Sequence, residues 1–269
     1  MIRNFIPLVA LGLLVSCNDM NKESSEDSEM QTTATDSVST QPEEEITDPE
    51  ATEFWDPEPA VVSFDKNNIP SDAIVLFNGE NLDAWKSVTD TTAAAPWTIN
   101  SDGSFTVKAQ SGDIETKESF GDMQLHIEWR APQEVVGESQ GRGNSGIFLQ
   151  KKYEVQVLDS YDNRTYSNGQ ASSIYKQSVP LVNATKPTSE WQTYDIIYHQ
   201  PHFDGDGNKT QAATVTVIHN GVVTQDHTEI QGTTEYIGHP KNIPHGEAPI
   251  ELQDHGNPVS YRNIWVRKL

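Results

Sequence analysis

The residues best suited to acid–base chemistry lie in the segment 153–159, which reads YEVQVLD. Side chains alternate between the two faces of a strand, so Glu154 and Gln156 share one face. Asp159 reaches that face only if a bulge interrupts the strand before it. Glycoside hydrolysis uses carboxyls in this way, since one attacks the sugar and another protonates the leaving oxygen. The plainer interpretation is a partly solvated strand whose acids have no function.

A second candidate group follows a short apolar stretch near the C-terminus. Gln253, Asp254 and His255 come directly before Gly256, where we expect the chain to turn. An imidazole at the end of a strand can act as a general base or bind a metal ion. It can equally cap the loop through a hydrogen bond and have no role in catalysis.

A third group lies on the segment 124–130. His126 and Glu128 are two positions apart, so both side chains project from the same face of a strand. Together with Glu154 they could bind one divalent metal ion, which is the cofactor that this set predicts. The alternative is an ion pair with Arg130 or Arg142. The segment 204–208 resembles the start of a calcium loop but lacks the later glycine and glutamate, so it predicts a turn.

The elements that must position these groups are strands. About ten or eleven short strands are indicated and no 3.6-residue period indicates a helix. The expected strands are 74–77, 97–99, 104–108, 124–130, 146–150, 153–159, 191–200, 212–219, 222–225, 249–253 and 261–267. Many antiparallel strands, each with one apolar and one polar face, predict an all-β, antiparallel jelly-roll sandwich. Polar residues on its central strands favour a concave sugar-binding groove.

The N-terminal part of the chain has a different composition. Residues 1–16 form a predicted signal peptide, and the only cysteine, Cys17, stands where a bacterial lipobox requires one. Residues 17–60 form an acidic, disordered tether, because residues 18–60 carry a net charge of −13 and few aliphatic side chains. Residues 61–269, with a net charge of −10, form the folded domain. We expect an exported lipoprotein that is held at a membrane through Cys17, in the periplasm or at the cell surface.

The composition also limits the partners. With a single cysteine the domain has no internal disulfide and depends on its apolar core. Nucleic acid is not an expected partner, because phosphate binding needs basic patches and both parts of the chain are acidic. A carbohydrate is the expected ligand.

Seven motifs, in order along the chain, resemble one known family. They lie at 76–85 (LFNGENLDAW), 112–122 (GDIETKESFGD), 125–130 (LHIEWR), 143–147 (GNSGI), 153–160 (YEVQVLDS), 191–195 (WQTYD) and 252–259 (LQDHGNPV). The chain resembles the 3-keto-disaccharide hydrolase family, also known as domain of unknown function 1080, over roughly residues 70–269. The resemblance implies a concanavalin A-like lectin/glucanase jelly roll. It also implies action on glycosides with a 3-keto sugar, supplied by a partner 3-dehydrogenase.

A 3-keto group makes the proton on C2 acidic, so a base could remove it and expel the C1 substituent before water adds. This route needs a base, an electrophile at the keto oxygen and a proton donor, but no pair of carboxylates. The amide at Gln156 therefore weighs against an ordinary retaining glycosidase and is compatible with elimination. The residues expected to be catalytic are Glu154, Asp159 and His255. Those expected to contact substrate are Arg142, Asn144, Gln156, Gln253 and Glu128, and the metal ligands are His126, Glu128 and Glu154.

Two other functions remain compatible with the sequence. One is a surface carbohydrate-binding lipoprotein without turnover, in which Trp55, Trp97, Tyr161 and Tyr175 would stack on sugars. The other is a conventional glycoside hydrolase that acts on unmodified β-glucans. Release of the aglycone from a disaccharide, compared with release from its 3-keto form, separates the three functions.

Overall fold

The computed structural model describes residues 46–269, and Pro59–Leu269 form one compact unit. The signal peptide, the lipidation site at Cys17 and most of the tether lie outside the described residues. The end of the tether contains one exposed 3-10 helix, η1 (Pro49–Thr52). Within residues 46–269, no helix is long and apolar enough to cross a membrane.

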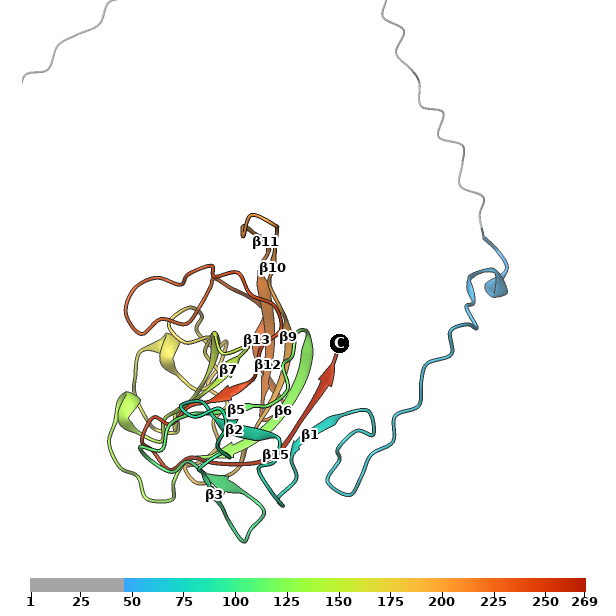
Figure 1. The fold of residues 1–269 in the computed structure, drawn as a ribbon. Coiled ribbons are helices and arrows are strands. Elements are labelled where there is room, and N and C mark those ends of the chain that lie inside the picture. The colour runs from blue at the N-terminus through green and yellow to red at the C-terminus, as the bar shows by residue number, and fades with distance from the viewer. Residues whose placement is uncertain (1–45) are drawn as a thin grey trace, which may run out of the picture. The chain divides into compact units, whose positions relative to one another are not determined.

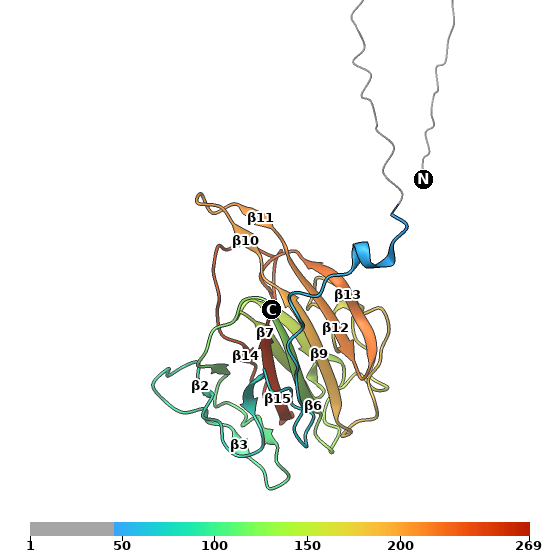
Figure 2. The ribbon, with the colours of Figure 1, turned by 90° about the vertical axis from the view of Figure 1, so that its right-hand side faces the viewer.

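Eight strands form the larger of two main sheets. Five of them follow the order β13-β12-β9-β6-β15, and β15 continues the sheet to β4, β3 and β1. Figure 2 shows the five long strands side by side. The eight strands of this sheet are β1 (Ile74–Phe77), β3 (Thr98–Ile99), β4 (Phe105–Thr106), β6 (Met123–Arg130), β9 (Gln192–His199), β12 (Ala213–His219), β13 (Val222–Ile230) and β15 (Ser260–Lys268).

The smaller sheet has five strands in the order β2-β5-β14-β7-β8. These are β2 (Trp85–Ser87), β5 (Ile114–Thr116), β14 (Glu251–Leu252), β7 (Ser145–Leu149) and β8 (Tyr153–Val157). A separate hairpin consists of β10 (His202–Phe203) and β11 (Lys209–Gln211). In the described part of the chain, helical structure is otherwise limited to the 3-10 turns η2 (Ser139–Gly141) and η3 (Ser167–Gly169).

All strand pairs are antiparallel, so the predicted all-β sandwich is confirmed. The described residues contain fifteen strands, more than the ten or eleven predicted. The additional strands, β2, β5, β10 and β11, have two or three residues. A strand this short shows no alternating pattern, so sequence periodicity cannot reveal it.

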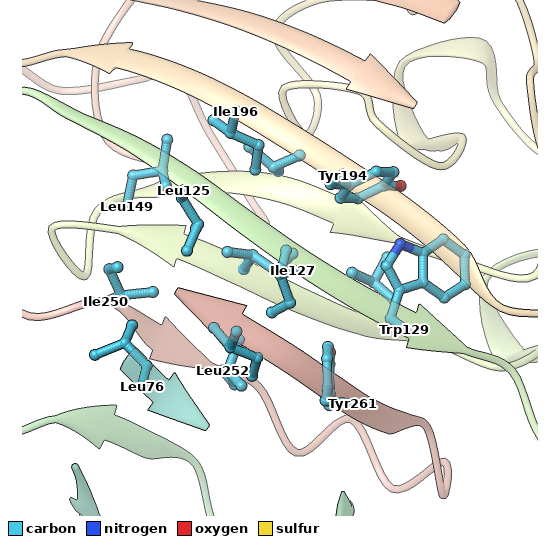
Figure 3. Close-up of a cluster of buried hydrophobic side chains, with 14 of the residues drawn as sticks. Leu76, Leu125, Ile127, Trp129, Leu149, Tyr194, Ile196, Ile250, Leu252 and Tyr261 are labelled. Carbon is cyan, nitrogen blue, oxygen red and sulfur yellow. The ribbon is translucent and has the colours of Figure 1, made fainter. Parts of the chain in front are cut away.

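The core lies between the two sheets and follows the alternation of β6. Leu125, Ile127 and Trp129 point inward and are buried, while His126 and Glu128 between them point outward. The inward side chains meet those of the facing strands, as Figure 3 shows for the labelled cluster. Burial of one such aliphatic side chain stabilises the fold by about 1.5–3 kcal/mol. Packing of this apolar core therefore fixes the position of one sheet relative to the other.

The outer face of the smaller sheet is covered by two long loops. The loops 158–191 and 231–250 lie on the side of this sheet that faces away from the larger one (Figure 1). All five residues of β8 are consequently buried, on both faces of the strand. In β6, by contrast, every second residue stays partly exposed. The polar side chains of β8 thus lie in an enclosed space.

Candidate functional site

The floor of the site is the outer face of the smaller sheet. Strand pairing places Glu251 opposite Phe148 and Phe148 opposite Glu154, so the three side chains form one row across the sheet. The next row contains Gly146 opposite Gln156. The predicted shared face of Glu154 and Gln156 is therefore confirmed.

One wall comes from the loop that follows β8. The segment 172–175 runs along β8 as an additional edge, because Gln156 N donates to Ser173 O at 3.0 Å and Tyr175 N donates to Glu154 O at 3.1 Å. This pairing fixes Tyr175 beside Glu154. The Tyr175 hydroxyl lies 2.6 Å from that of Tyr166, so the two phenols form one hydrogen-bonded pair.

The second wall comes from the loop after β13. Thr234 Oγ1 accepts from Glu154 N at 2.9 Å, and Thr234 N donates to the carbonyl of Lys152 at 2.7 Å. These bonds bring Tyr236 to the site, where the ammonium group of Lys176 lies 4.3 Å from its ring centroid. Lys176 also donates to the Tyr236 carbonyl at 2.5 Å. Both walls are thus attached to the backbone of Glu154.

Floor and walls enclose a cavity of about 770 Å³. Its lining combines aromatic rings with amides, one carboxyl, one imidazole and one ammonium group. The lining residues are Gln140, Gly141, Asn144, Phe148, Glu154, Gln156, Tyr166, Tyr175, Lys176, Thr234, Tyr236, Gln253 and His255. A few polar groups among aromatic walls are typical of a small-molecule site.

Glu154 is the most perturbed ionisable group in this cavity. Its side chain is 4% exposed and forms no ion pair with any described residue. Burial without a counter-charge raises the pKa of Glu154 to about 8. Glu154 therefore exchanges its proton near neutral pH, which suits a general acid or base.

Two further acceptors in the lining have no partner. Asn144 Oδ1 and Gln253 Oε1 are buried, and no described residue donates to either. Asn144 is held by its own Nδ2, which donates to the carbonyl of Gln140 at 2.7 Å. Because unpaired buried acceptors are costly, these two oxygens need a donor that the described residues do not supply. His255 completes this side of the cavity as an exposed residue.

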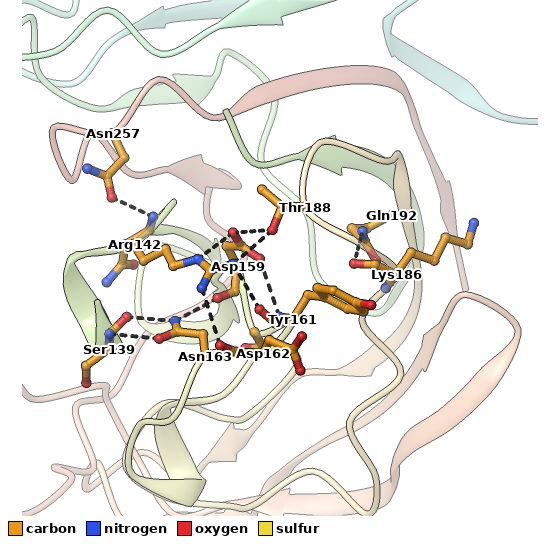
Figure 4. Close-up of polar contacts among 12 residues, drawn as sticks. Ser139, Arg142, Asp159, Tyr161, Asp162, Asn163, Lys186, Thr188, Gln192 and Asn257 are labelled. Carbon is orange, nitrogen blue, oxygen red and sulfur yellow. Dashed lines mark hydrogen bonds and ion pairs between the residues drawn. The ribbon is translucent and has the colours of Figure 1, made fainter. Parts of the chain in front are cut away.

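Asp159 does not join Glu154 in the cavity, contrary to the expectation that a bulge would bring it round. Strand β8 ends at Val157, and the Asp159 amide donates to the carbonyls of Arg142 and Gly143. The carboxylate accepts from Arg142 Nε and from Thr188 Oγ1, both at 2.8 Å (Figure 4). Asp159 and Arg142 thus form a buried ion pair beside a separate cavity of about 110 Å³.

The predicted metal set is not brought together either. His126 and Glu128 lie on the outer face of the larger sheet, whereas Glu154 lies on the outer face of the smaller one. His126 Nδ1 lies 2.6 Å from Asp195, and Glu128 pairs with Arg262 at 2.7 Å. Residues 46–269 contain no group of three His, Cys, Asp or Glu placed to hold a metal ion.

On the outer face of the larger sheet, His126 pairs with Asp195 and Glu128 pairs with Arg262, so their opposite charges compensate one another. Burial lowers the pKa of His126, but hydrogen bonds and attraction from Asp195 and Glu128 outweigh burial and raise it to about 9. For Glu128, burial raises the pKa, yet His126, Asn263 and Arg262 together lower it to about 2. The expected ion pair is present, although its arginine is Arg262 instead of Arg130 or Arg142. Glu128 accordingly lies outside the large cavity.

Several site residues were missed by the sequence analysis. Tyr166, Lys176 and Tyr236 come from irregular loops and Gln140 from the three-residue 3-10 turn η2, and none of these segments carries a period. Glu251 was also missed, although its place in the predicted strand 249–253 would have indicated a floor position. Burial and the neighbouring carboxyl of Asp113 raise the pKa of Glu251 to about 7.

Comparisons with known proteins identify the family and the fold of this chain. The model of the 3-keto-alpha-glucoside-1,2-lyase-like domain matches residues 72–267. A Bacteroides thetaiotaomicron protein named 3-keto-disaccharide hydrolase is 25% identical, over 98% of each chain. A crystal structure from Parabacteroides distasonis, described as a candidate glycosyl hydrolase, is 55% identical with a TM-score of 0.79 and covers 82% of this chain and 97% of its own.

A second Parabacteroides distasonis structure is 20% identical, has a TM-score of 0.53 and covers 74% of this chain and 94% of its own. It has the same fold, which confirms the predicted jelly-roll sandwich of the lectin/glucanase type. The family match spans nearly the whole compact unit and reaches every strand of both sheets. The chain therefore belongs to the 3-keto-alpha-glucoside-1,2-lyase-like family of carbohydrate-active proteins, as its motifs predicted.

Proposed function

We propose that this protein cleaves the glycosidic bond of 3-keto-glycosides by elimination, followed by addition of water. The observation that supports this most directly is Glu154, a buried carboxyl without a counter-ion on the floor of the large cavity. A single carboxyl whose pKa lies near neutrality suits removal of a weakly acidic proton. Direct hydrolysis would use two carboxyls, and Glu154 is the one carboxyl among the lining residues.

In this reaction Glu154 is the base. Its carboxylate takes the proton from C2, and the electrons of the C2–H bond move toward the 3-keto group to form an enolate. The C1–oxygen bond then breaks, and its electron pair leaves with the aglycone oxygen, which gains a proton. The product is an unsaturated 3-keto sugar, which becomes a free sugar when water adds to the double bond. His255, exposed at the cavity, is the proposed proton donor.

Lys176 is the proposed electrophile. It is the one lysine or arginine among the described residues that line the cavity, and no carboxylate pairs with it. Three tyrosine rings surround its ammonium group, at 4.3 to 6.0 Å from their centroids. A fixed positive charge in such a site stabilises an oxygen that becomes negative in the transition state. Arg142, which was expected from the sequence to contact substrate, instead pairs with Asp159 outside the lining of this cavity.

Substrate recognition is assigned to the remaining lining groups. The amide side chains of Asn144 and Gln253 line the cavity and are assigned to sugar hydroxyls, and Phe148 and Tyr166 offer apolar ring surface. The volume of about 770 Å³ lies within the usual range of small-molecule sites, about 300–1,000 Å³. A disaccharide is therefore the proposed substrate size, and a 3-dehydrogenase remains the proposed partner that supplies it.

The test is a comparison of substrates. The purified protein is incubated with a disaccharide and with its 3-keto form, and release of the aglycone sugar is followed by chromatography. We expect release from the 3-keto form alone, with an unsaturated sugar as an early product. Glu154→Gln should abolish release. Equal rates for both substrates would contradict the proposal, and binding of unmodified glycans without any product would favour a sugar-binding protein.

We also propose that the protein is exported and anchored through a lipid on Cys17. This rests on the sequence of residues 1–17. Labelling of cells with a fatty-acid analogue should modify the wild type and leave Cys17→Ser unmodified. Equal labelling of both would contradict the proposal.

A further inference from the structure

Two glutamine amides connect Glu154 to a backbone carbonyl of the covering loop. Gln140 Nε2 donates to the carbonyl of Gly169 at 2.8 Å and to Thr165 Oγ1 at 3.0 Å. A carbonyl oxygen can only accept, so the bond to Gly169 fixes which end of the Gln140 amide is the nitrogen. Gln140 Oε1 must then face the other way, toward Gln156.

The orientation of Gln140 determines that of Gln156. Gln156 Nε2 donates to Gln140 Oε1 at 2.9 Å and also faces the carbonyl of Gly169 at 3.5 Å. The opposite end of the Gln156 amide, its oxygen, lies 3.0 Å from Glu154 Oε1 and 3.1 Å from the carbonyl of Ser145. Two oxygens at 3.0 Å attract each other only when one of them carries a proton. The protonated carboxyl of Glu154 can supply that proton.

We propose that Gln140 acts through Gln156 as a positioning residue that keeps a proton on Glu154 in the resting protein. Gln140 and Gln156 are called the amide relay here. The proposal deepens the proposed function, on which it rests only for the use of that proton in catalysis. A carboxyl that holds its proton more firmly is also a stronger base once ionised, which suits removal of a proton from carbon.

Ionisation of Glu154 would favour the opposite orientation of Gln156. With its nitrogen turned inward, Gln156 would donate to Glu154 Oε1 at 3.0 Å and to the Ser145 carbonyl at 3.1 Å. Its oxygen would then lie 2.9 Å from Gln140 Oε1, where two acceptors repel each other. Gln140 therefore opposes the orientation that stabilises the charge, while Ser145 favours it. Removal of the Gln140 oxygen should release Gln156 to turn.

Other ionisable groups also face the carboxyl of Glu154. They are Tyr166, Tyr175 and Lys176 on one loop, Tyr236 on the other, His255 beyond β14, and Tyr261 on β15 beneath the floor. No side chain of these donates a hydrogen bond to Glu154. The positive charge of Lys176 favours ionisation and so acts against the relay. Within the relay, the oxygen of Gln156 faces the Glu154 carboxyl directly. It can accept a hydrogen bond from the protonated carboxyl and so favours that form.

The experiment measures protonation without substrate. The protein is labelled with glutamate carrying carbon-13 at the side-chain carboxyl, and the Glu154 signal is identified by its loss in Glu154→Gln. Titration of this signal in Gln140→Met should give a midpoint about one pH unit below wild type, because Gln156 can then donate to the charged carboxylate. Gln140→Ala, which removes the same oxygen with a smaller side chain, is titrated in parallel in case the first variant does not fold.

Two controls separate the relay from a loosened loop. Thr165→Val removes the other acceptor of Gln140 but leaves the bond to Gly169, so the Glu154 midpoint should stay at the wild-type value. In the Gln156→Met background, Gln140→Met should no longer lower the midpoint, because the connecting amide is gone. A merely structural role of Gln140 would lower the midpoint equally in both backgrounds.

An unchanged or higher midpoint in both Gln140 variants would overturn the proposal, and so would an equal drop in Thr165→Val. These outcomes do not depend on turnover, so they are distinct from failure of the proposed function. If the protein is active on a 3-keto-glycoside, the pH profile of kcat/KM should move in Gln140→Met by the same amount as the NMR midpoint.

Discussion

The carboxylate of Glu154 lies directly over the backbone of Gly146. A Cβ atom at residue 146 would come within 2.7 Å of Glu154 Oε1 and 2.9 Å of Phe148 Cε2. Real atoms do not approach this closely, so a side chain at 146 must displace the carboxylate or the ring. The absence of a side chain on the neighbouring strand therefore gives Glu154 its position.

Gly146→Ala is expected to lower kcat/KM on a 3-keto-glycoside by roughly tenfold to a hundredfold, since a shift of about 1 Å in a catalytic group has this effect. Gly205→Ala is the matched control, because a Cβ at residue 205 meets no atom within 4 Å. Steady-state kinetics of both variants test the relationship. Equal activity of the two would show that the position of the Glu154 carboxylate is not critical.

The raised pKa of Glu154 predicts that replacement of this residue by glutamine has opposite effects on activity and stability. The group is protonated in the folded protein up to about pH 8, whereas in the unfolded chain it ionises near its ordinary value of 4.5. The folded state binds the extra proton in between, so its contribution to stability falls as pH rises from about 4.5 to 8. Glu154→Gln should therefore abolish activity yet raise the free energy of unfolding at pH 8, by a few kcal/mol at most.

Thermal unfolding of Glu154→Gln and wild type at pH 4.5 and pH 8 tests this. The difference in Tm should be larger at pH 8. A variant that is less stable than wild type at pH 8 would contradict a buried, protonated carboxyl.

As the proposed base, Glu154 also sets the pH profile of wild-type turnover. Because the ionised form removes the proton, kcat/KM should rise with pH and level off above about pH 8. The measurement is initial rates on a 3-keto-glycoside between pH 5 and 9.5. Loss of activity above pH 8 would instead assign Glu154 to proton donation.

Lys176 should contribute to the transition state more than to substrate binding. Lys176→Met removes the charge and keeps the length of the side chain, so we expect kcat to fall by about 100-fold with a smaller change in KM. Lys117→Met is the control, because Lys117 is an exposed residue outside the lining of the cavity. A rise in KM alone would assign Lys176 to substrate binding.

Asp159 should act on stability alone. Asp159→Ala leaves the side chain of Arg142, which is 14% exposed, without its carboxylate partner. Loss of one member of a largely buried pair destabilises a protein by about 3–5 kcal/mol. The variant should therefore unfold at a lower temperature, whereas its pH profile at a permissive temperature should match that of wild type. A shifted pH profile of activity would instead indicate that Asp159 takes part in catalysis.

The sequence by itself determined the longer strands and the family. The alternation in 124–130 gave the buried face of β6, and the alternation in 153–157 gave the shared face of Glu154 and Gln156. Both patterns are local, because period two is a property of one strand. The ordered motifs were sufficient for the family, which the match over residues 72–267 confirms.

Only the tertiary structure decided which polar faces share a cavity. His126, Glu128 and Glu154 have equivalent local patterns, yet the strands belong to different sheets and their polar faces point away from each other across the core. Lys176 and Tyr236 reach Glu154 because segment 172–175 and Thr234 bind the backbone of β8. Such contacts join residues far apart in sequence and leave no periodic signal. Long-range packing of the sheets and loops therefore places Glu154 in the cavity. The same packing leaves His126 and Glu128, which have the same local pattern, in ion pairs on the other sheet.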